Sequence, residues 1–382
     1  MPAGRRLHVA FVADTFDSTI AGGVRSARRF VDALRERHDV TVVAAGVTGD
    51  GSVALPAFYP PIFGGVMREM GFVFAVPRRR TLEDLFRRVD VVHVQFPFWL
   101  GMRAAAIANA VGTPLVSAFH VQPENLLYNI GLRSPRLVDW TYRLFVRRLY
   151  DRSASVVCPS RFALEELRAH GLRAPAEVIS NGIAPGLGPE PLERHERHRG
   201  KLLVLAVGRL AREKRLDVTI EGVRRSRHAD RIQLVVTGRG PDEAEIRRRA
   251  AALPVPAELG FVSEAELRRL LVTADLLVHS SEVELEGMAV LEALACGTPA
   301  LVARSARSAA PQFAISDDFL FEPGDAGDLA RRLDLLFEAP ERLREARPRC
   351  LALAGSYRFE DSVRRLEELY LRVAGREAAA AG

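Results

Sequence analysis

The sequence predicts an α/β protein of two domains, each with a parallel β-sheet covered by helices on both faces. Two observations support this. Apolar strand-like runs alternate with helical segments along the first half, and the same alternation starts again after a polar break. The length of 382 residues also allows two domains with full cores. Apolar residues make up 48% and charged residues 27%, which is typical of a globular protein rather than a disordered one.

In the first half, short apolar runs predict strands and longer amphipathic runs predict helices. Strands are expected at residues 7–13, 40–45, 90–95, 114–119, 155–158 and 177–179. Helices are expected at residues 24–37 and 102–110. The chain then becomes polar and rich in Pro and Gly, which predicts a first domain over residues 1–184 and an interdomain linker over 185–200.

The second half repeats the pattern over a predicted domain of residues 201–355. Strands are expected at residues 202–207, 233–237, 258–260, 276–279 and 300–303, and helices at 216–226, 242–252, 264–273 and 288–295. A last amphipathic helix is expected over residues 356–375, with Val363, Leu366, Leu369 and Tyr370 on one face.

The segment after the fourth strand of this half carries two carboxylates around a helix start. Glu284 precedes the helix, Glu292 lies on it, and Gly287 offers bare backbone between them. A helix start presents N–H groups and a positive dipole end, which suits a phosphate. A carboxylate accepts hydrogens from pairs of hydroxyls, which suits a sugar. An ordinary βα unit with surface acids would show the same local spacing.

Two cations flank the loop after the first strand of the second half. Arg209 and Lys214 would lie at the carboxyl edge of the sheet, where open α/β folds bind ligands. Fixed cations there could neutralise a diphosphate as it leaves. A solvated basic loop is the alternative, although Lys214 is one of only two lysines in a chain with 52 arginines.

In the first half, a glycine pair and a histidine follow strands. Gly22 and Gly23 precede a helix, where bare backbone allows close approach of a phosphate or an acceptor. His120 ends the strand at 114–119 and is followed by Glu124 and Asn125. A lone histidine of this kind is more often structural than catalytic.

Residues 284–299, with two glutamates eight apart and then Ala-Leu-Ala-Cys-Gly-Thr-Pro, resemble the donor-site signature of retaining glycosyltransferase family 4. Residues 206–215 resemble the diphosphate-binding motif of that family. The resemblance implies the GT-B fold, in which two Rossmann-like domains face each other across a cleft and a C-terminal helix crosses back to the first domain. The family commonly has Gly-Phe-Gly after the first glutamate, whereas this chain has Leu-Glu-Gly at 285–287, so the sugar stays open.

The resemblance further implies a UDP- or GDP-sugar donor, with Glu292 on the ribose and Glu284 on the transferred sugar. The residues expected to act in catalysis are His120, Glu284, Arg209 and Lys214. The residues expected to bind the donor are Gly22, Gly23, Gly238, Val262, Gly287, Met288, Ala289 and Glu292. Glu124 and Asn125 are expected on the acceptor side. The sequence has no convincing Asp-x-Asp motif, so we expect no metal or other cofactor, and the cationic pair would stabilise the leaving group instead.

Positive charge is concentrated in the first half, which has a net charge of +7 over residues 1–185 against −1 for the rest. Within it Arg136, Trp140, Arg143 and Arg147 share one helical stripe, and Tyr142, Phe145 and Tyr150 are expected to add aromatic bulk beside it. Basic side chains with aromatics suit an anionic membrane surface, although the aromatics could instead pack internally. Because no apolar run is long enough to span a bilayer and the start lacks a signal core, we expect a cytoplasmic protein, peripheral on the inner face of the plasma membrane.

The sequence therefore predicts a retaining glycosyltransferase that moves a hexose to a membrane lipid such as diacylglycerol or a phosphoinositide. A soluble sugar or sugar phosphate is the alternative acceptor. A GT-B sugar-nucleotide epimerase would bind the same donor without an acceptor. A nucleic-acid binder would explain the charge but not the glutamate pair, so no nucleic-acid partner is expected.

Overall fold

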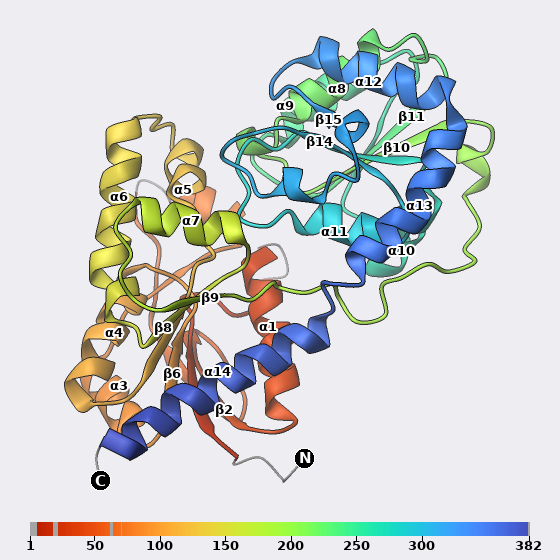
Figure 1. The fold of residues 1–382 in the computed structure, drawn as a ribbon. Coiled ribbons are helices and arrows are strands. Elements are labelled where there is room, and N and C mark those ends of the chain that lie inside the picture. The colour runs from red at the N-terminus through yellow and green to blue at the C-terminus, as the bar shows by residue number, and fades with distance from the viewer. Residues whose placement is uncertain (1–5, 18–21, 62–63, 70, 381–382) are drawn as a thin grey trace. The chain divides into compact units, whose positions relative to one another are not determined.

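The computed structural model describes residues 6–17, 22–61, 64–69 and 71–380, and the chain divides into two compact units (Figure 1). The first unit contains residues 1–181 together with 360–382, and the second contains Gly182–Phe359. Each unit is built on one parallel sheet with helices packed on its faces, as the alternating pattern predicts.

The first unit has a seven-stranded sheet with the order β3-β2-β1-β6-β7-β8-β9. Its strands are β1 (His8–Val12), β2 (Asp39–Ala45), β3 (Ser52–Leu55), β6 (Val91–Val94), β7 (Leu115–Ala118), β8 (Ser155–Cys158) and β9 (Ala176–Val178). All neighbours pair in parallel. A small antiparallel pair, β4 (Ala57–Phe58) and β5 (Phe74–Ala75), lies outside this sheet. The carboxyl ends of the seven strands therefore share one edge, which is where loops can gather into a site.

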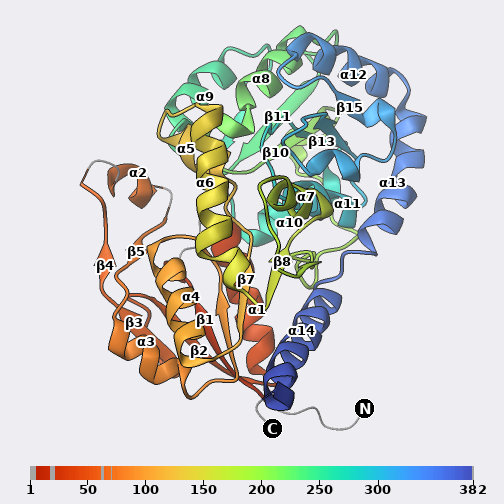
Figure 2. The ribbon, with the colours of Figure 1, turned by 60° about the vertical axis from the view of Figure 1, so that its left-hand side comes forward.

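The first unit also contains the last helix of the chain. The helices of the unit are α1 (Gly22–Arg35), α2 (Gly64–Glu69), α3 (Arg79–Phe86), α4 (Trp99–Val111), α5 (Pro123–Asn129), α6 (Pro135–Arg148), α7 (Arg161–Ala169) and α14 (Phe359–Ala380). Helix α14 lies beside α1 in both views (Figures 1 and 2). Its predicted apolar face is buried, since Val363, Leu366, Leu369 and Tyr370 are each at most 3% exposed. The predicted return of the C-terminal helix to the first domain is confirmed.

The second unit has a six-stranded parallel sheet with the order β12-β11-β10-β13-β14-β15. Its strands are β10 (Leu202–Val207), β11 (Ile232–Thr237), β12 (Glu258–Gly260), β13 (Leu276–His279), β14 (Ala300–Ala303) and β15 (Leu320–Phe321). Alternate residues of β10 enter different cores: Val204 and Ala206 belong to one cluster, Leu203 and Leu205 to the other. This alternation is what a strand buried on both faces requires.

Helices cover both faces of the second sheet. They are α8 (Leu216–Arg225), α9 (Glu243–Ala251), α10 (Glu264–Thr273), α11 (Met288–Ala295), α12 (Ala326–Glu338) and α13 (Pro340–Ala354). Buried side chains of α8, α9 and α12 join the core on one face, and those of α10 and α11 join the core on the other. The start of α11 is thereby fixed at the carboxyl edge of the sheet, directly after the loop that follows β13.

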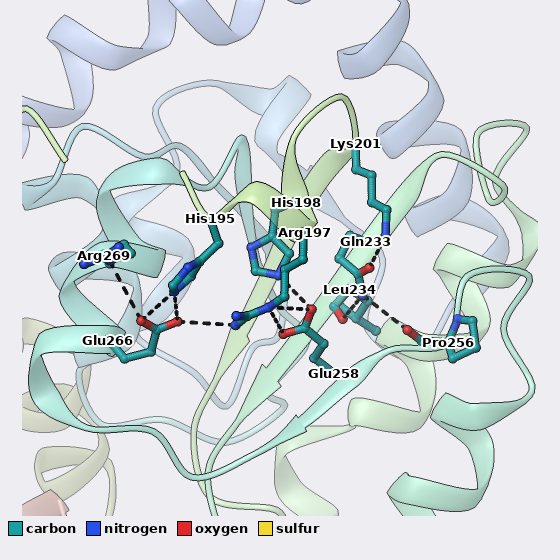
Figure 3. A network of polar contacts seen from close by, with 10 residues as sticks. All are labelled: His195, Arg197, His198, Lys201, Gln233, Leu234, Pro256, Glu258, Glu266 and Arg269. Atoms are coloured by element: carbon teal, nitrogen blue, oxygen red, sulfur yellow. Dashed lines mark hydrogen bonds and ion pairs between the residues drawn. The ribbon is translucent and has the colours of Figure 1, made fainter. Parts of the chain in front are cut away.

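The segment that leads from β9 to β10 is held onto the second unit by a network of polar contacts (Figure 3). His195 lies 3.0 Å from the carboxylate of Glu266 on α10, and His198 lies 2.8 Å from Glu258 on β12. The guanidinium of Arg197 lies between these carboxylates, 3.2 Å from Glu258 and 3.6 Å from Glu266. Residues 185–200, which the composition suggested as a linker, are thus part of the second compact unit.

Candidate active site

Three glycines close the carboxyl end of the second sheet, directly after β10 and β11 and at the end of β12. The N–H of Gly208 donates to the carbonyl of Thr237 at 3.1 Å, and the N–H of Gly238 donates to the carbonyl of Gly260 at 3.1 Å. A Cβ on Gly238 would lie 1.8 Å from the carbonyl oxygen of Gly208, and φ at Gly238 is +157°. Only glycine fits this approach of two backbones. Gly238 thus has a structural reason to be glycine, and its contact with a donor stays a prediction.

The candidate cations Arg209 and Lys214 lie in the loop after β10, and both are paired with carboxylates. Nη2 of Arg209 lies 2.5 Å from Oε1 of Glu213, whose side chain is almost fully buried. Lys214 ends a short 3-10 helix, Arg212–Lys214, and its Nζ contacts Oε1 of Glu284. These ion pairs hold both cations at the carboxyl edge of the sheet, where the sequence predicts them.

Glu284 is the point where this loop meets the loop after β13. Besides Lys214, its carboxylate has Nε2 of His279 at 3.2 Å. Burial alone would raise the pKa of Glu284, but Lys214 and His279 outweigh that effect and hold the pKa well below its usual range. The Glu284 backbone is also fixed, because its carbonyl accepts from the N–H of Ala309 at 2.9 Å. The result is an ionised, oriented carboxylate that can accept hydrogens from sugar hydroxyls.

His279 is a site residue that the sequence analysis missed. It is the last residue of β13, it is buried, and its ring approaches Glu284 from the strand side. The signal was present in the sequence, since a histidine at the carboxyl end of a buried strand lies directly before the polar loop that carries Glu284.

Helix α11 begins at the bare backbone of Gly287. The φ of Gly287 is +97°, and a Cβ there would lie 2.9 Å from the Cβ of Ala310. The N–H groups of Met288 and Ala289 at the start of the helix have no intrahelical carbonyl to bond, whereas the N–H of Val290 donates to the carbonyl of Gly287 at 2.9 Å. Glu292 lies one turn after Met288 and is half-buried. The predicted donor residues on this segment therefore share one helix end.

The loops after β11 and β12 add an exposed aromatic ring. Phe261 is 54% exposed, and the guanidinium carbon of Arg239 lies 4.8 Å from the centre of its ring. Val262 is half-buried and packs against the core instead. The side chain of Val262 is thus used for packing, and a contact of Val262 with a donor stays a prediction.

In the first unit, Gly23 and His120 are neighbours. A Cβ on Gly23 would lie 3.6 Å from the ring of Phe96 and 3.9 Å from the Cβ of His120. Burial lowers the pKa of His120 to about 4, so its imidazole is neutral at pH 7. Residues 18–21, which directly precede Gly22, lie outside the described residues. The remaining geometry places the two predicted elements of the first unit side by side.

Glu124 and Asn125, predicted on the acceptor side, lie on the short helix α5. Glu124 is 6% exposed and its Oε2 accepts a hydrogen bond from the hydroxyl of Tyr142 on α6 at 3.1 Å. Asn125 is half-buried. The carboxylate of Glu124 therefore joins α5 to α6, and a contact of either residue with an acceptor stays a prediction.

The basic stripe of α6 is exposed, but most of the aromatic residues assigned to it are not. Arg136, Arg143 and Arg147 are exposed, and Trp140 is 55% exposed. Tyr142, Phe145 and Tyr150 are at most 4% exposed and pack in the core of the first unit, with Phe119 edge-on to Tyr142 and Tyr150. Their predicted place beside the stripe was wrong. Tyr142 and Phe145 lie two positions after stripe residues, on the opposite face of the helix, and Tyr150 lies beyond the end of α6, in the short 3-10 helix Tyr150–Arg152.

Membrane-spanning helices, metal ligands and cysteines were considered over the whole described part of the chain. Within it, every helix is too short or too polar to cross a bilayer. Among the same residues there is no group of three or more His, Cys, Asp or Glu side chains placed to hold a metal ion. The three cysteines are buried as free thiols.

Two family profiles cover most of the chain. Residues 20–187 match Glycosyltransferase Family 4, and residues 190–349 match Glycosyl transferases group 1. The chain is 29% identical over 317 residues to a GDP-mannose-dependent alpha-mannosyltransferase of Mycolicibacterium smegmatis, which spans 77% of this chain and 79% of that protein.

The name of a second relative includes a phosphatidylinositol glycolipid. The chain is 28% identical over 350 residues to the GDP-mannose-dependent alpha-(1-6)-phosphatidylinositol dimannoside mannosyltransferase of Mycobacterium tuberculosis, covering 85% of this chain and 86% of that protein. Among solved structures, Anabaena HepE in complex with UDP-glucose superposes with a TM-score of 0.74 at 16% identity, over 95% of this chain and 99% of HepE. At that identity the superposition shows a common fold.

Proposed function

This chain is a glycosyltransferase of family 4 with the GT-B fold, and we propose that it is a retaining enzyme that transfers a hexose from a UDP- or GDP-sugar to a membrane lipid. The family and the fold predicted from the sequence are confirmed. The nucleotide, the hexose and the acceptor are the parts that we propose.

The observation that carries the donor proposal is the ion pair between Lys214 and Glu284 beside the start of α11. During transfer, the bond between the sugar and the diphosphate breaks and negative charge grows on the diphosphate. Arg209 and Lys214 would stabilise that charge, and the N–H groups at the start of α11 would bind phosphate oxygens. Glu284 would at the same time accept hydrogens from hydroxyls of the sugar.

The lipid acceptor is supported by the first unit and by the relatives. Three arginines and Trp140 form an exposed stripe on α6. Such a stripe is attracted to anionic headgroups, and an exposed tryptophan suits the membrane interface. The name of the Mycobacterium tuberculosis relative includes a glycolipid, phosphatidylinositol dimannoside. A soluble sugar or sugar phosphate is the acceptor to prefer if the stripe does not bind membranes.

The direct test is an acceptor and donor panel. Purified protein would be incubated with labelled UDP-glucose, UDP-galactose and GDP-mannose, each with anionic lipid vesicles or with soluble sugars and sugar phosphates. We expect label in the lipid fraction with one donor. Label in soluble product only would exclude the lipid acceptor, and no transfer with any donor would count against the proposed reaction.

The first specific prediction concerns Glu292 as the ribose contact. Glu292→Ala is expected to weaken binding of the nucleoside diphosphate by about 1–3 kcal/mol, because buried ribose hydroxyls would lose their acceptor. Isothermal titration calorimetry measures this. Glu243→Ala is the matched control, since Glu243 is also a helix glutamate of the second unit and forms an ion pair of 2.8 Å with exposed Arg247. Equal affinities in both variants would remove Glu292 from the donor site.

A second prediction concerns the stripe on α6. Replacing Arg136, Arg143 and Arg147 together by serine is expected to weaken binding to phosphatidylserine vesicles by up to about 1 kcal/mol per charge. Arg143 should contribute least, because its Nε lies 2.9 Å from Asp139. The loss should shrink in 1 M salt, where the Debye length is about 3 Å. Vesicle cosedimentation measures the binding.

The control for this experiment removes the same number of charges elsewhere. Arg247, Arg248 and Arg249 on α9 all form ion pairs with glutamates of their own helix, and their replacement by serine lowers the net charge equally. If the two triple variants sediment alike, net charge rather than the stripe determines binding, and the soluble acceptor becomes the better proposal.

A further inference from the structure

A chain of three hydrogen bonds joins the last helix of the protein to the start of the first helix. The hydroxyl of Tyr370 on α14 lies 2.8 Å from Nδ1 of His93 on β6. Nε2 of His93 lies 3.3 Å from Oε1 of Gln95, and Nε2 of Gln95 lies 3.4 Å from the carbonyl oxygen of Gly23. All three side chains are at most 2% exposed. All four residues belong to the first unit, where α14 lies beside α1 (Figures 1 and 2).

The donor and the acceptor of each hydrogen bond in this series follow from the carbonyl of Gly23 at its end. A backbone carbonyl only accepts, so the group of Gln95 that faces Gly23 is its NH2. The amide oxygen of Gln95 then faces His93, so Nε2 of His93 carries the hydrogen. Nδ1 of His93 must therefore accept, which makes Tyr370 the donor. Every hydrogen bond of this series therefore donates in the same direction, from Tyr370 towards Gly23.

The protonation states keep this polarity fixed. Burial lowers the pKa of His93 to about 3, so its ring stays neutral, and burial holds the pKa of Tyr370 well above its usual value. The ring of Phe11 also stacks on the ring of His93, with the two ring centroids 4.6 Å apart, and limits its movement. A rigid, neutral chain therefore ends on the backbone of a residue that has no side chain of its own to fix it.

We propose that Tyr370, His93 and Gln95 are positioning residues that hold the backbone of Gly23 in place beside His120 for the transfer reaction. The proposal rests on the proposed function, because it takes His120 and Gly23 as parts of the reaction site. Gly23 lies in the first turn of α1, where glycine stabilises a helix less than alanine does, and a hydrogen bond to its carbonyl helps to fix the Gly23–Val24 peptide plane. The bond thereby orients the N–H of Val24 in the first turn of α1. The last helix of the chain is in this way coupled to the site by polar contacts as well as by packing.

The first test removes one hydroxyl. Tyr370→Phe is expected to lower transfer turnover about 5- to 10-fold, the effect of one buried hydrogen bond. The affinity for nucleoside diphosphate should change much less, because most of the residues expected to bind the donor lie in the second unit. Tyr150→Phe is the matched control: Tyr150 is fully buried in the same unit, and its hydroxyl has no hydrogen-bond partner among the described residues. Equal turnover in the two variants would overturn the proposal.

The second test uses the polarity. Gln95→Met removes both bonds, and we expect turnover to fall about tenfold at every pH. Gln95→Glu places an oxygen against the carbonyl of Gly23 when ionised, but a protonated carboxyl restores the donor. Its turnover relative to wild type should rise as the pH falls from 8 to 6. The ratio to wild type is needed because burial raises the pKa of the nearby Asp14 to about 7, whereas His93 and His120 stay neutral in this range. A ratio that does not change with pH would contradict the proposal.

A readout without catalysis separates this inference from the proposed reaction. Hydrogen exchange by mass spectrometry should show several-fold faster exchange in the first two turns of α1 for Tyr370→Phe and Gln95→Met, but not for Tyr150→Phe. Unchanged exchange in all three variants would overturn the positioning role whether or not the wild type transfers a hexose. If the two variants exchange faster but the wild type transfers no hexose, the result would count against the proposed function alone.

Discussion

Lys214→Ala is expected to lower turnover by about 10²- to 10³-fold and to raise the KM for the donor much less. The reason is that negative charge on the diphosphate is greater in the transition state than in the bound donor. A fixed ammonium group therefore stabilises the transition state more than the ground state. Nζ of Lys214 is positioned for this by its contact with Glu284 and by the short helix that ends at Lys214. Steady-state kinetics with the donor identified by the panel would measure both constants.

Lys201→Ala is the matched control, because the chain has only these two lysines. Lys201 lies at the opposite end of β10, where its Nζ donates to Oε1 of Gln233 at 2.8 Å (Figure 3). The Lys201→Ala variant should have a turnover within about twofold of that of the wild type. Near-normal turnover of Lys214→Ala would remove Lys214 from the catalytic set. Loss of the circular dichroism spectrum would instead assign it a structural role, so the spectrum is recorded for both variants.

The fold of this chain was largely predictable because its central strands are buried on both faces. Strands β10 and β13 have the bounds that the sequence predicts, since continuous runs of Leu, Val and Ala end at Gly208 and at the polar loop after His279. The edge strands β3 and β15 were not predicted. They are only four and two residues long, and their pairing with distant strands leaves little local pattern.

The site was predictable as a set of loops but not as a set of contacts. In a parallel sheet the loops after the strands share one edge, so Arg209, Lys214 and Glu284 could be placed in one region. That Lys214 contacts Glu284, 70 positions away, depends on tertiary packing that local spacing does not encode. The same holds for the bond between Tyr370 and His93, which are 277 positions apart.

For the stripe on α6, by contrast, the spacing along the sequence was enough to predict which aromatic side chains are buried. Tyr142 and Phe145 follow Trp140 and Arg143 by two positions, which is more than half a turn, so they point to the other face of the helix. Their burial in the structure follows from that geometry. The exposed stripe itself, with Trp140 among three arginines, agrees with the spacing of i, i+4, i+7 and i+11.

Glu284→Gln should lower the stability of the protein as well as its turnover. Removing the carboxylate leaves the ammonium of Lys214 in a site where the two side chains are only 19% and 16% exposed. Breaking a fully buried pair costs about 3–5 kcal/mol, and we expect the lower end here because some solvent reaches the pair. Glu282→Gln is the matched control in the same loop. Glu282 pairs with Arg215 and Arg307, but its side chain and its partners are more exposed, so its loss should cost no more than about 1 kcal/mol.

The stability difference between wild type and Glu284→Gln should depend on pH in one direction. The folded pKa of Glu284 lies below its ordinary value of 4.5, because Lys214 and His279 outweigh the effect of burial. The stabilising contribution of the carboxylate is therefore complete above about pH 5.5 and is lost progressively as the pH falls through and below 4.5, where the unfolded chain takes up a proton first. Thermal unfolding midpoints of both proteins between pH 4 and 8 would show a constant gap that narrows only at the acid end. A gap that widens in acid would mean that Glu284 is protonated in the folded protein, and the ionised carboxylate assigned to the sugar hydroxyls would have to be abandoned.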